Sequence, residues 1–305
     1  MSIAIFFEGK DSDSWAAALT KRLPDTPIEI HPEITHPEAV QMAACWRPPA
    51  HSLEQLPNLQ LIQSIGAGIN HITNTQQLGS GVRLCRFVDE HLSHDIFEYV
   101  LGGILGHLRN LKPPVNKLWK PESYKRLSDT TVTILGLGAI GGHIATQLAK
   151  LGTRVNGWSR SKKELEGVAT YFGKEGLSEA LQGTDILVSV LPLTPETTDL
   201  INRDLMAQLN PGAFVINVGR GHHLVDNDLV SLIEEKHLSG ALLDVFREEP
   251  LPQDHPFWRM PEVIITPHIA AITDPGRAID LIVDNWNRLQ KSEPLKHEVD
   301  LKRGY

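Results

Sequence analysis

The stretch Thr131-Val132-Thr133-Ile134-Leu135-Gly136-Leu137-Gly138-Ala139-Ile140-Gly141 decides the fold class of this chain. Its first part is rich in β-branched residues and predicts a buried strand, and a helical pattern follows the glycines as far as Leu151. In the spacing G-x-G-x-x-G, the first glycine permits a tight turn and the second lets the backbone approach a pyrophosphate. The third lets helix and strand pack closely. The motif therefore predicts a dinucleotide site, whose cofactor-binding residues are Gly136, Gly138, Ala139, Ile140 and Gly141.

A basic cluster follows this turn at about the distance, roughly 20 residues, where an acidic side chain usually binds the ribose hydroxyls of NAD. The sequence there is Gly157-Trp158-Ser159-Arg160-Ser161-Lys162-Lys163, with no carboxylate. An Arg pairs with the 2′-phosphate of NADP, which a carboxylate would repel. We predict NADP(H) as the cofactor, with Arg160 as the main determinant, Lys162 as support and Ser159 as a hydrogen-bond donor to the phosphate. Lys163 is expected in solvent, and weaker use of NAD(H) stays open.

On both sides of the glycine-rich turn, short β-branched runs alternate with longer helical patterns, which predicts βαβ units and parallel sheets. The fold class is α/β, with two doubly wound parallel-sheet domains, a flavodoxin-like substrate domain and a Rossmann cofactor domain, and a cleft between them. The candidate strands are Ile3–Phe7, Ile28–His31, Met42–Trp46, Leu61–Ile65 and Val82–Phe87, then Thr131–Leu135, Arg154–Trp158, Ile186–Val190, Ala213–Asn217, Gly240–Leu243 and Val263–Thr266.

Two helical patterns mark the domain boundaries. Asp95–Arg109 predicts a long helix that ends at the Lys112-Pro113-Pro114 break, and the last helix, about Asp274–Lys291, comes after the second series of strands is complete. We expect this tail to fold back on the first domain. Residues 1–93 with 275–305 then form the substrate domain, and residues 94–274 form the cofactor domain.

The composition narrows the class of protein. A formal net charge of −8 over 305 residues argues against general affinity for nucleic acid or membranes, which are polyanionic. No window approaches the roughly 18 apolar residues of a membrane span, and Met1–Phe7 predicts a first strand and not a signal peptide. Cys45 and Cys85 have neither metal nor redox spacing, which predicts buried thiols in a cytoplasmic protein without a metal site.

Three strand ends in the second series carry unusual side chains. Arg220 lies between two glycines after Ala213–Asn217, Asp244 to Pro252 follows Gly240–Leu243 with several carboxylates, and His268 follows Val263–Thr266. Ligands of open α/β sheets gather where the strands end. Reduction of a 2-keto acid needs a proton for the carbonyl oxygen, which a His can donate. A carboxylate would orient that His, and an Arg would bind the substrate carboxylate and polarise the carbonyl.

A glycine-containing loop in the first domain adds a candidate anion site. Ser64-Ile65-Gly66-Ala67-Gly68-Ile69-Asn70 follows the strand Leu61–Ile65, and its amides could bind a carboxylate.

Taken together, these residues resemble the D-isomer-specific 2-hydroxyacid dehydrogenase family over nearly the whole chain. The segments that carry the resemblance are Gly66–Gly68, Gly136–Gly141, Leu191–Thr197, Asn217–Gly221, Asp244–Phe246, Glu249–Pro252 and Pro267-His268. Within the family the chain is similar to bacterial reductases of glyoxylate and hydroxypyruvate. The grounds are Trp46 in C-W-R-P-P, the W-S-R cofactor loop, Thr266–Thr273 and the tail Val299–Tyr305.

The resemblance implies a role for each catalytic candidate. Arg220 would bind the substrate, His268 would be the acid/base, and Glu249 would be its partner. Glu248 is a rival for that carboxylate, but in the family pattern the Glu directly precedes Pro-Leu. Gly219 departs from the commoner Ala before the Arg, which could loosen the loop.

The resemblance also implies the binding residues and the assembly. Ala67 and Gly68 would bind the substrate carboxylate through their amides, and Trp46 would close a small pocket. Asp244 would lie near the nicotinamide, and the loop with Leu191 and Pro192 would pass beside the cofactor. The protein would be a homodimer, through the helix after Asp95 and the arm around Trp119.

The expected activity is NADPH-dependent reduction of small 2-keto acids, glyoxylate to glycolate and hydroxypyruvate to glycerate, in the cleft between the domains. One alternative is an NAD-dependent dehydrogenase of a larger D-2-hydroxy acid, against which Arg160 and Trp46 argue. Another is a non-catalytic dinucleotide-sensing binding protein, against which the set Arg220, Glu249 and His268 argues.

Overall fold

The computed structural model describes residues 1–111 and 123–301. By its contacts the chain divides into two compact units: unit 1 is Met1–Asp89 with Thr273–Tyr305, and unit 2 is Glu90–Ile272. These boundaries lie a few residues before the predicted ones at 93/94 and 274/275. The predicted helix break at 112–114, the arm around Trp119 and the last residues of the tail, 302–305, lie outside the described residues.

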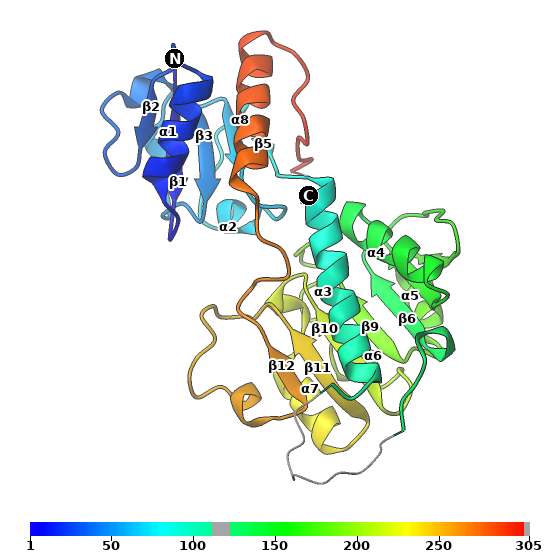
Figure 1. The fold of residues 1–305 in the computed structure, drawn as a ribbon. Helices are drawn as coiled ribbons and strands as arrows, with labels where there is room; N and C mark the ends of the chain where they lie inside the picture. Colours follow the sequence, from blue (N-terminus) through cyan, green and yellow to red (C-terminus); the bar gives the residue numbers. More distant parts are fainter. Residues whose placement is uncertain (112–122, 302–305) are drawn as a thin grey trace. The chain divides into compact units, whose positions relative to one another are not determined.

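Unit 1 is built on a five-stranded parallel sheet of order β2-β1-β3-β4-β5, the flavodoxin-like order (Figure 1). Two helices pack side by side on it, α1 (Ser12–Arg22) and α8 (Pro275–Gln290), and an ion pair of 2.6 Å joins Arg22 to Asp280. A buried hydrogen bond of 2.7 Å, from the side-chain amide of Asn285 to the side-chain oxygen of Gln63, joins α8 to β4. The strands are β1 (Ser2–Phe7), β2 (Ile28–Ile30), β3 (Val40–Trp46), β4 (Leu61–Ser64) and β5 (Arg83–Cys85), and α2 (Asn70–Thr73) is a short helix.

Unit 2 contains a seven-stranded parallel sheet of order β12-β11-β10-β9-β6-β7-β8. The order reverses between β6 and β9, which confirms the predicted dinucleotide-binding topology and puts the ligand edge at the carboxyl ends of these strands. The strands are β6 (Thr131–Leu135), β7 (Arg154–Ser159), β8 (Val168–Phe172), β9 (Ile186–Ser189), β10 (Ala213–Asn217), β11 (Leu238–Leu243) and β12 (Val263–Ile265).

The prediction missed one strand, β8. It lies at the edge of the sheet and pairs only with β7 among the described strands, and its residues are half-buried or exposed. Because the core makes little demand on these side chains, the segment has no run of large aliphatic residues to mark it as a strand.

The helices of unit 2 surround this sheet (Figure 1). The longest described helix, α3 (Glu90–Leu108), begins five residues before the predicted start at Asp95 and packs against α4 (Ala139–Lys150). The others are α5 (Gly173–Leu181), α6 (Arg203–Met206) and α7 (Asp226–Glu234). In the part of the chain that the structure describes, none of the helices has the length and apolarity needed to cross a bilayer.

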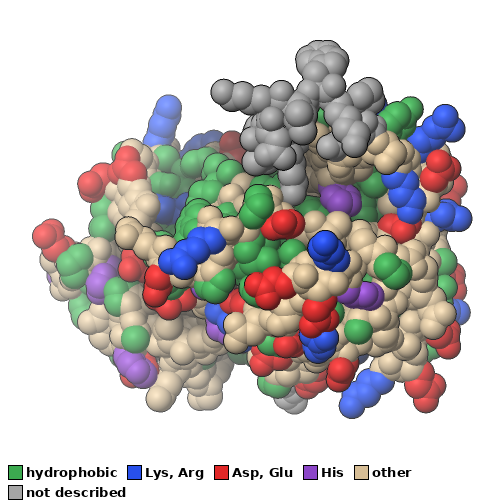
Figure 2. Space-filling view, turned by 90° about the horizontal axis from the view of Figure 1, so that it is seen from below, with side chains coloured by type: hydrophobic (Ala, Val, Ile, Leu, Met, Phe, Trp, Pro, Cys, Tyr) green, Lys and Arg blue, Asp and Glu red, His purple; other side chains and the backbone are tan. Residues whose placement is uncertain are grey.

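Both cysteines are buried, unpaired thiols in unit 1. Burial is the first cause that raises the pKa of Cys85 to about 12, and it raises the pKa of Cys45 further. On the face drawn in Figure 2, Lys and Arg side chains are interspersed with Asp and Glu.

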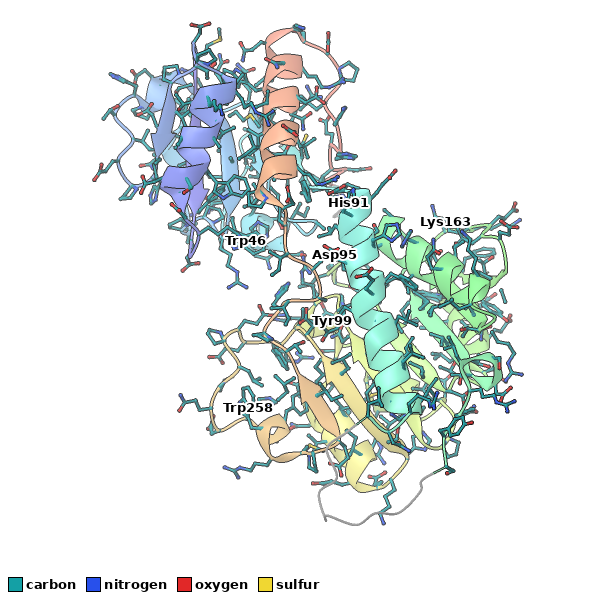
Figure 3. All side chains as sticks on the ribbon, in the orientation of Figure 1. Trp46, His91, Asp95, Tyr99, Lys163 and Trp258 are labelled. Atoms are coloured by element: carbon teal, nitrogen blue, oxygen red, sulfur yellow. The ribbon has the colours of Figure 1, made fainter. Side chains whose placement is uncertain are left out.

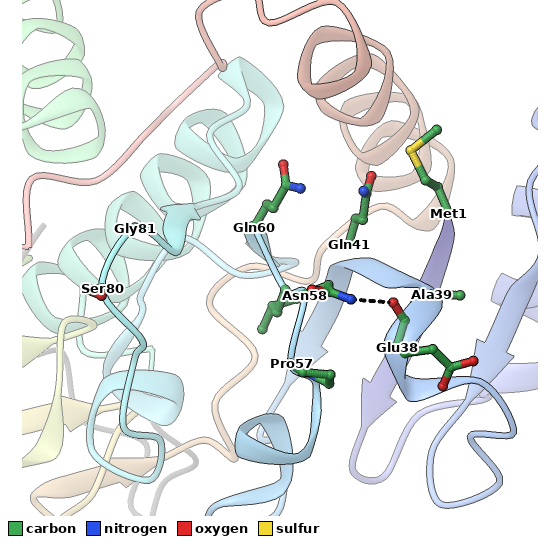
Figure 4. Close-up of a pocket in the computed structure, with 10 residues that line it drawn as sticks. Met1, Glu38, Ala39, Gln41, Pro57, Asn58, Gln60, Ser80 and Gly81 are labelled. Carbon is green, nitrogen blue, oxygen red and sulfur yellow. Dashed lines mark hydrogen bonds between the residues drawn. The ribbon is translucent and has the colours of Figure 1, made fainter.

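A hollow of about 420 Å³ lies in unit 1 at the amino ends of the strands (Figure 4). Its lining includes Glu38, whose carbonyl oxygen accepts a bond of 2.8 Å from Asn58, together with Gln41, Gln60 and Ser80. Ligands of such sheets bind at the opposite, carboxyl ends of the strands. The functional site is therefore expected at the carboxyl ends and not in this hollow.

Candidate active site

The glycine-rich turn after β6 fits a dinucleotide. Gly136 has φ +101°, and a Cβ on it would lie 3.0 Å from the Val190 carbonyl oxygen; a Cβ on Gly141 would lie 1.8 Å from the Gly136 oxygen. Packing within the protein therefore requires these two glycines. A Cβ on Gly138 would meet nothing within 4 Å, and Gly138 is the N-cap of α4 without a side-chain hydrogen bond. The open space over this helix N-terminus suits a pyrophosphate.

The basic cluster lies on the loop after β7, where Figure 3 labels Lys163. Arg160 and Lys163 are exposed, and Lys162 forms an ion pair of 3.1 Å with Glu164. The Ser159 hydroxyl donates to the Ser161 carbonyl oxygen at 2.7 Å, so in this conformation its hydrogen stabilises the loop. Arg160 as the main determinant and Ser159 as a phosphate donor both stay predictions.

His268 and Glu249 form a hydrogen-bonded pair at the carboxyl ends of β12 and β11. His268 Nδ1 lies 2.9 Å from Glu249 Oε2, and the other Glu249 oxygen accepts a bond of 3.1 Å from the Phe246 amide. Glu248 is exposed, and no contact between it and His268 is found among the described residues. The carboxylate that contacts the His is therefore that of Glu249.

The backbone of His268 is held in a left-handed conformation, with φ +56°. For a non-glycine residue this conformation costs about 1–3 kcal/mol and persists only where the surroundings impose it. Here the His268 amide donates to the Asp244 carbonyl oxygen at 2.9 Å, which fixes the segment after β12 against the segment after β11.

A buried network stabilises the same segment. The Asp244 carboxylate, 1% exposed, accepts hydrogen bonds from the Thr266 hydroxyl at 2.6 Å and from the amides of residues 269–270 at 2.8 Å each. Tyr99 on α3 (Figure 3) lies 2.5 Å from the Thr266 oxygen and must be the donor, because the Thr266 hydrogen goes to Asp244. Burial raises the pKa of Tyr99 to about 12. Both oxygens of Asp244 thus hold the loop of His268, and its predicted contact with the nicotinamide stays a prediction.

Arg220 extends from the segment after β10. Its Nη1 donates to the Gly219 carbonyl oxygen at 2.6 Å, and the Asn217 side chain accepts from the Gly219 amide and donates to the Arg220 carbonyl oxygen. A Cβ on Gly221 would lie 1.9 Å from the Phe246 carbonyl carbon, so the segments after β10 and β11 touch through their backbones. Arg220, Glu249 and His268 therefore come from three successive loops on one edge of the sheet.

His223 is a residue that the prediction missed. It ends a 3₁₀ turn (Gly221–His223) and is fully buried; its Nδ1 accepts from the Arg220 amide at 3.2 Å, and its Nε2 lies 3.2 Å from the Pro192 carbonyl oxygen. Burial, and then the charges of Arg220 and His222, lower the pKa of His223 to about 4. The signal in the sequence was the pair of His directly after Arg220-Gly221.

This His makes the stability of the protein pH-dependent. Its folded pKa lies below its ordinary value of 6.5, so the unfolded chain takes up the proton first as the pH falls, and stability decreases from about pH 7 toward pH 4. We expect the His223 contribution to the free energy of unfolding to drop by about 2 kcal/mol between pH 7 and pH 5.

Urea unfolding of the wild type and of His223→Gln at both pH values measures this loss, because the other titrating groups are common to the two proteins. The wild type should lose about 2 kcal/mol more than the variant. Equal losses would mean that His223 is not held neutral.

In unit 1, the loop after β4 has the features of an anion site. A Cβ on Gly66 would lie 2.6 Å from the ring of Trp46, which also packs against His71 with ring centroids 5.0 Å apart. The Ser64 hydroxyl accepts from the Gly66 amide at 3.2 Å. Within residues 1–111 and 123–301, the amides of Ala67 and Gly68 have no hydrogen-bond acceptor in the protein. Lys10 Nζ lies 5.0 Å from the Trp46 ring, so the loop has a cation nearby.

The loop after β9 contains Leu191 and Pro192. Leu191 is buried, and the Pro192 carbonyl oxygen accepts from the Thr197 hydroxyl at 2.7 Å as well as facing His223. Among the described residues, no group of three or more His, Cys, Asp or Glu side chains is arranged for a metal ion.

Comparison with known proteins identifies relatives over the whole chain. Residues 104–270 match the family model "D-isomer specific 2-hydroxyacid dehydrogenase, NAD binding domain". Proteins described as glyoxylate/hydroxypyruvate reductase A are similar over their full length: that of Serratia proteamaculans is 37% identical with 100% of both chains covered, and that of Yersinia enterocolitica is 37% identical with 98% and 97% covered.

Solved structures agree with these matches. A D-isomer specific 2-hydroxyacid dehydrogenase from Xanthobacter autotrophicus, in complex with NADPH and MES, has a TM-score of 0.94 at 34% identity, covering 100% of this chain and 99% of that one. An NADPH-dependent glyoxylate/hydroxypyruvate reductase from Sinorhizobium meliloti, in complex with NADP and sulfate, has a TM-score of 0.92 at 34% identity, with 100% of both chains covered.

Proposed function

The chain belongs to the D-isomer-specific 2-hydroxyacid dehydrogenase family, and we propose that it reduces small 2-keto acids, glyoxylate and hydroxypyruvate foremost, with NADPH. The observation that carries the proposal is the His268–Glu249 pair at 2.9 Å, on the same sheet edge as Arg220 and the glycine-rich turn. This edge joins a proton donor, a cation for a carboxylate and a dinucleotide site, which are the requirements for reducing a keto acid.

The bound NADPH would supply a hydride to the keto carbon of the substrate. His268 gives the proton to the carbonyl oxygen, and because its Nδ1 faces Glu249, the proton leaves from Nε2. Glu249 accepts the hydrogen of Nδ1 and so fixes the orientation of the ring while Nε2 holds the proton.

Arg220 binds the substrate carboxylate and polarises the carbonyl, since a guanidinium presents several N–H donors in a planar fork. We propose that the amides of Ala67 and Gly68 also bind the carboxylate and that Trp46 limits the size of the substrate. A bulky ring against Gly66 suits a two- or three-carbon acid.

We propose NADP(H) as the preferred cofactor, with weaker use of NAD(H). The support is the exposed Arg160 on the loop after β7, with Lys162 and Ser159 beside it, and the NADP or NADPH in the two similar solved structures. The glycine-rich turn with Ala139 and Ile140, the loop with Leu191 and Pro192, and Asp244 would complete the cofactor site.

Arg160→Ala is expected to raise the Kd for NADPH about 10- to 100-fold, because a lost charge-assisted bond to phosphate costs about 1.5–3 kcal/mol. NADH has no 2′-phosphate, so its Kd should change by less than about twofold. Fluorescence titration measures both constants. Lys163→Ala, an exposed change in the same loop, serves as the matched control; if it weakened NADPH as much as Arg160→Ala, the assignment to Arg160 would fail.

The stereochemistry of the product tests the proposed reaction. Hydroxypyruvate is incubated with the protein and NADPH, and the glycerate is resolved by chiral chromatography. D-glycerate is expected from a member of this family, whereas L-glycerate, or no glycerate, would contradict the proposal. The homodimer and the cytoplasmic location stay predictions.

A further inference from the structure

The buried His223 contacts two segments that flank the proposed site. It lies three residues after Arg220 in the loop after β10, while Pro192 lies in the loop after β9. The loop after β9 in turn touches the glycine-rich turn, because a Cβ on Gly136 would come 3.0 Å from the Val190 carbonyl oxygen. The imidazole thus spans the distance between the Arg220 segment and a segment beside the dinucleotide turn.

The two hydrogen bonds of the ring fix its protonation. The Arg220 amide can only donate, so Nδ1 must carry a lone pair, and the Pro192 carbonyl can only accept, so Nε2 must carry the hydrogen. Backbone groups have fixed roles, unlike side-chain amides or hydroxyls. The Ser189 hydroxyl, 3.5 Å from Nδ1, makes at most a weak further contact. The ring is therefore the neutral Nε2–H tautomer.

Gly219 provides the space for this ring. A Cβ on Gly219 would lie 3.1 Å from both Nδ1 and Cε1 of His223 and 3.2 Å from the Leu191 amide nitrogen. The glycine before Arg220 thus lets the imidazole pack against it. The looser loop expected from the sequence stays a prediction.

We propose that His223 is a positioning residue that couples the Arg220 segment to the Pro192 segment, and so links keto-acid binding to cofactor binding. The inference rests on the proposed function for the identity of the two ligands. The positive charge of Arg220 disfavours protonation of the ring. A proton on Nδ1 would point at the Arg220 amide hydrogen and break the coupling.

Two substitutions separate the two bonds of the ring. In His223→Asn the side-chain oxygen takes the place of Nδ1 and can accept from the Arg220 amide. The shorter Asn side chain does not reach the Pro192 carbonyl oxygen. In His223→Gln the side-chain NH₂ takes the place of Nε2 and can donate to Pro192, but the Arg220 amide loses its acceptor. His223→Gln leaves the Arg220 amide without its acceptor, which commonly costs about 1–3 kcal/mol. His223→Asn removes one of the two donors to the Pro192 carbonyl oxygen, which keeps its bond of 2.7 Å from the Thr197 hydroxyl.

The experiment measures the Kd for NADPH by fluorescence titration and the KM for glyoxylate by steady-state assay, in the wild type, both variants and His222→Asn as the exposed neighbouring control. For His223→Asn we expect the Kd to rise about 5- to 10-fold and the KM to stay within about twofold. For His223→Gln we expect the reverse, a KM about 5- to 10-fold higher and a Kd within about twofold.

A merely structural role predicts a different pattern. If the two variants changed the Kd and the KM in parallel, with matching losses of Tm, or if neither constant moved, the proposal would be overturned. If the wild type does not oxidise NADPH with glyoxylate, the proposed function fails. In that case the Kd values for NADPH still test whether His223 acts on cofactor binding through Pro192. A Kd that rises only in His223→Asn supports this role, and equal Kd values in the wild type and both variants overturn it.

Discussion

His268→Asn is expected to lower kcat for glyoxylate about 10²- to 10⁴-fold, the range for loss of a general acid. The Asn amide can occupy the space and reach Glu249, but it has no acidic proton for the substrate oxygen. The Kd for NADPH should stay near the wild-type value, because the glycine-rich turn and Arg160 lie on other loops of the sheet. Steady-state NADPH oxidation gives kcat, and fluorescence titration gives the Kd.

Two further variants make this result specific. Glu249→Gln keeps a hydrogen-bond partner for the ring but removes the negative charge beside it, so a smaller loss of about 10- to 100-fold is expected. His36→Asn, at an exposed histidine of unit 1, controls for nonspecific effects and should leave kcat unchanged. A kcat for His268→Asn within about threefold of the wild type would remove His268 from the proton-donor role.

Arg220→Lys is expected to lower kcat/KM for glyoxylate about 10²- to 10³-fold, comparable to loss of a key transition-state donor. In the wild type, Nη1 bonds to the Gly219 carbonyl oxygen at 2.6 Å, which orients the planar guanidinium. A lysine ammonium keeps the charge but cannot bind that carbonyl and a carboxylate in the same fork geometry. Both kcat and KM should therefore worsen, as steady-state kinetics will measure.

The matched control is Arg259→Lys, an exposed arginine of the same unit in the 3₁₀ turn Pro256–Arg259. It should leave kcat/KM within about twofold of the wild type. If Arg220→Lys behaved like this control, charge alone would suffice at position 220 and the bidentate role would be wrong.

The sequence predicted the sheets well because their central strands are buried on both faces. Thr131–Leu135 and Ala213–Asn217 were predicted with the bounds that the structure has. The first run of β-branched and apolar residues ends directly at Gly136, and the second begins directly after Gly212. β8 and the first turn of α3 were not predicted. Most of their residues are polar or partly exposed, so hydrophobic periodicity does not mark these segments.

Only some residues of the candidate site could be predicted from the sequence. Their positions at strand ends indicated Arg220 and His268 as site residues. The residue pattern of this sequence did not separate Glu248 from Glu249, whereas the family pattern favoured Glu249. In the structure, Glu249 is the residue that bonds to His268. Tyr99 is 167 residues from Thr266, and no local pattern reports a contact at that separation. His223 lies three residues after the predicted Arg220, but its importance depends on a backbone partner in another loop.

The geometry also bears on the two alternatives considered for the chain. A dinucleotide-sensing protein has no need for a His268–Glu249 pair on the ligand edge, or for a buried network around Asp244 that holds His268 in a strained conformation. Against a dehydrogenase of larger hydroxy acids stands the prediction that the Trp46 ring, which leaves no space for a Cβ on Gly66, limits the size of the substrate.

The initial rate of NADPH and NADH oxidation, followed in parallel with glyoxylate and with hydroxypyruvate, tests the central claim most directly. Ready turnover of both acids with a strong preference for NADPH is the predicted result. Absence of turnover with either cofactor, despite measurable binding of NADPH, would contradict the claim that His268, Glu249 and Arg220 form the catalytic site of a small 2-keto acid reductase.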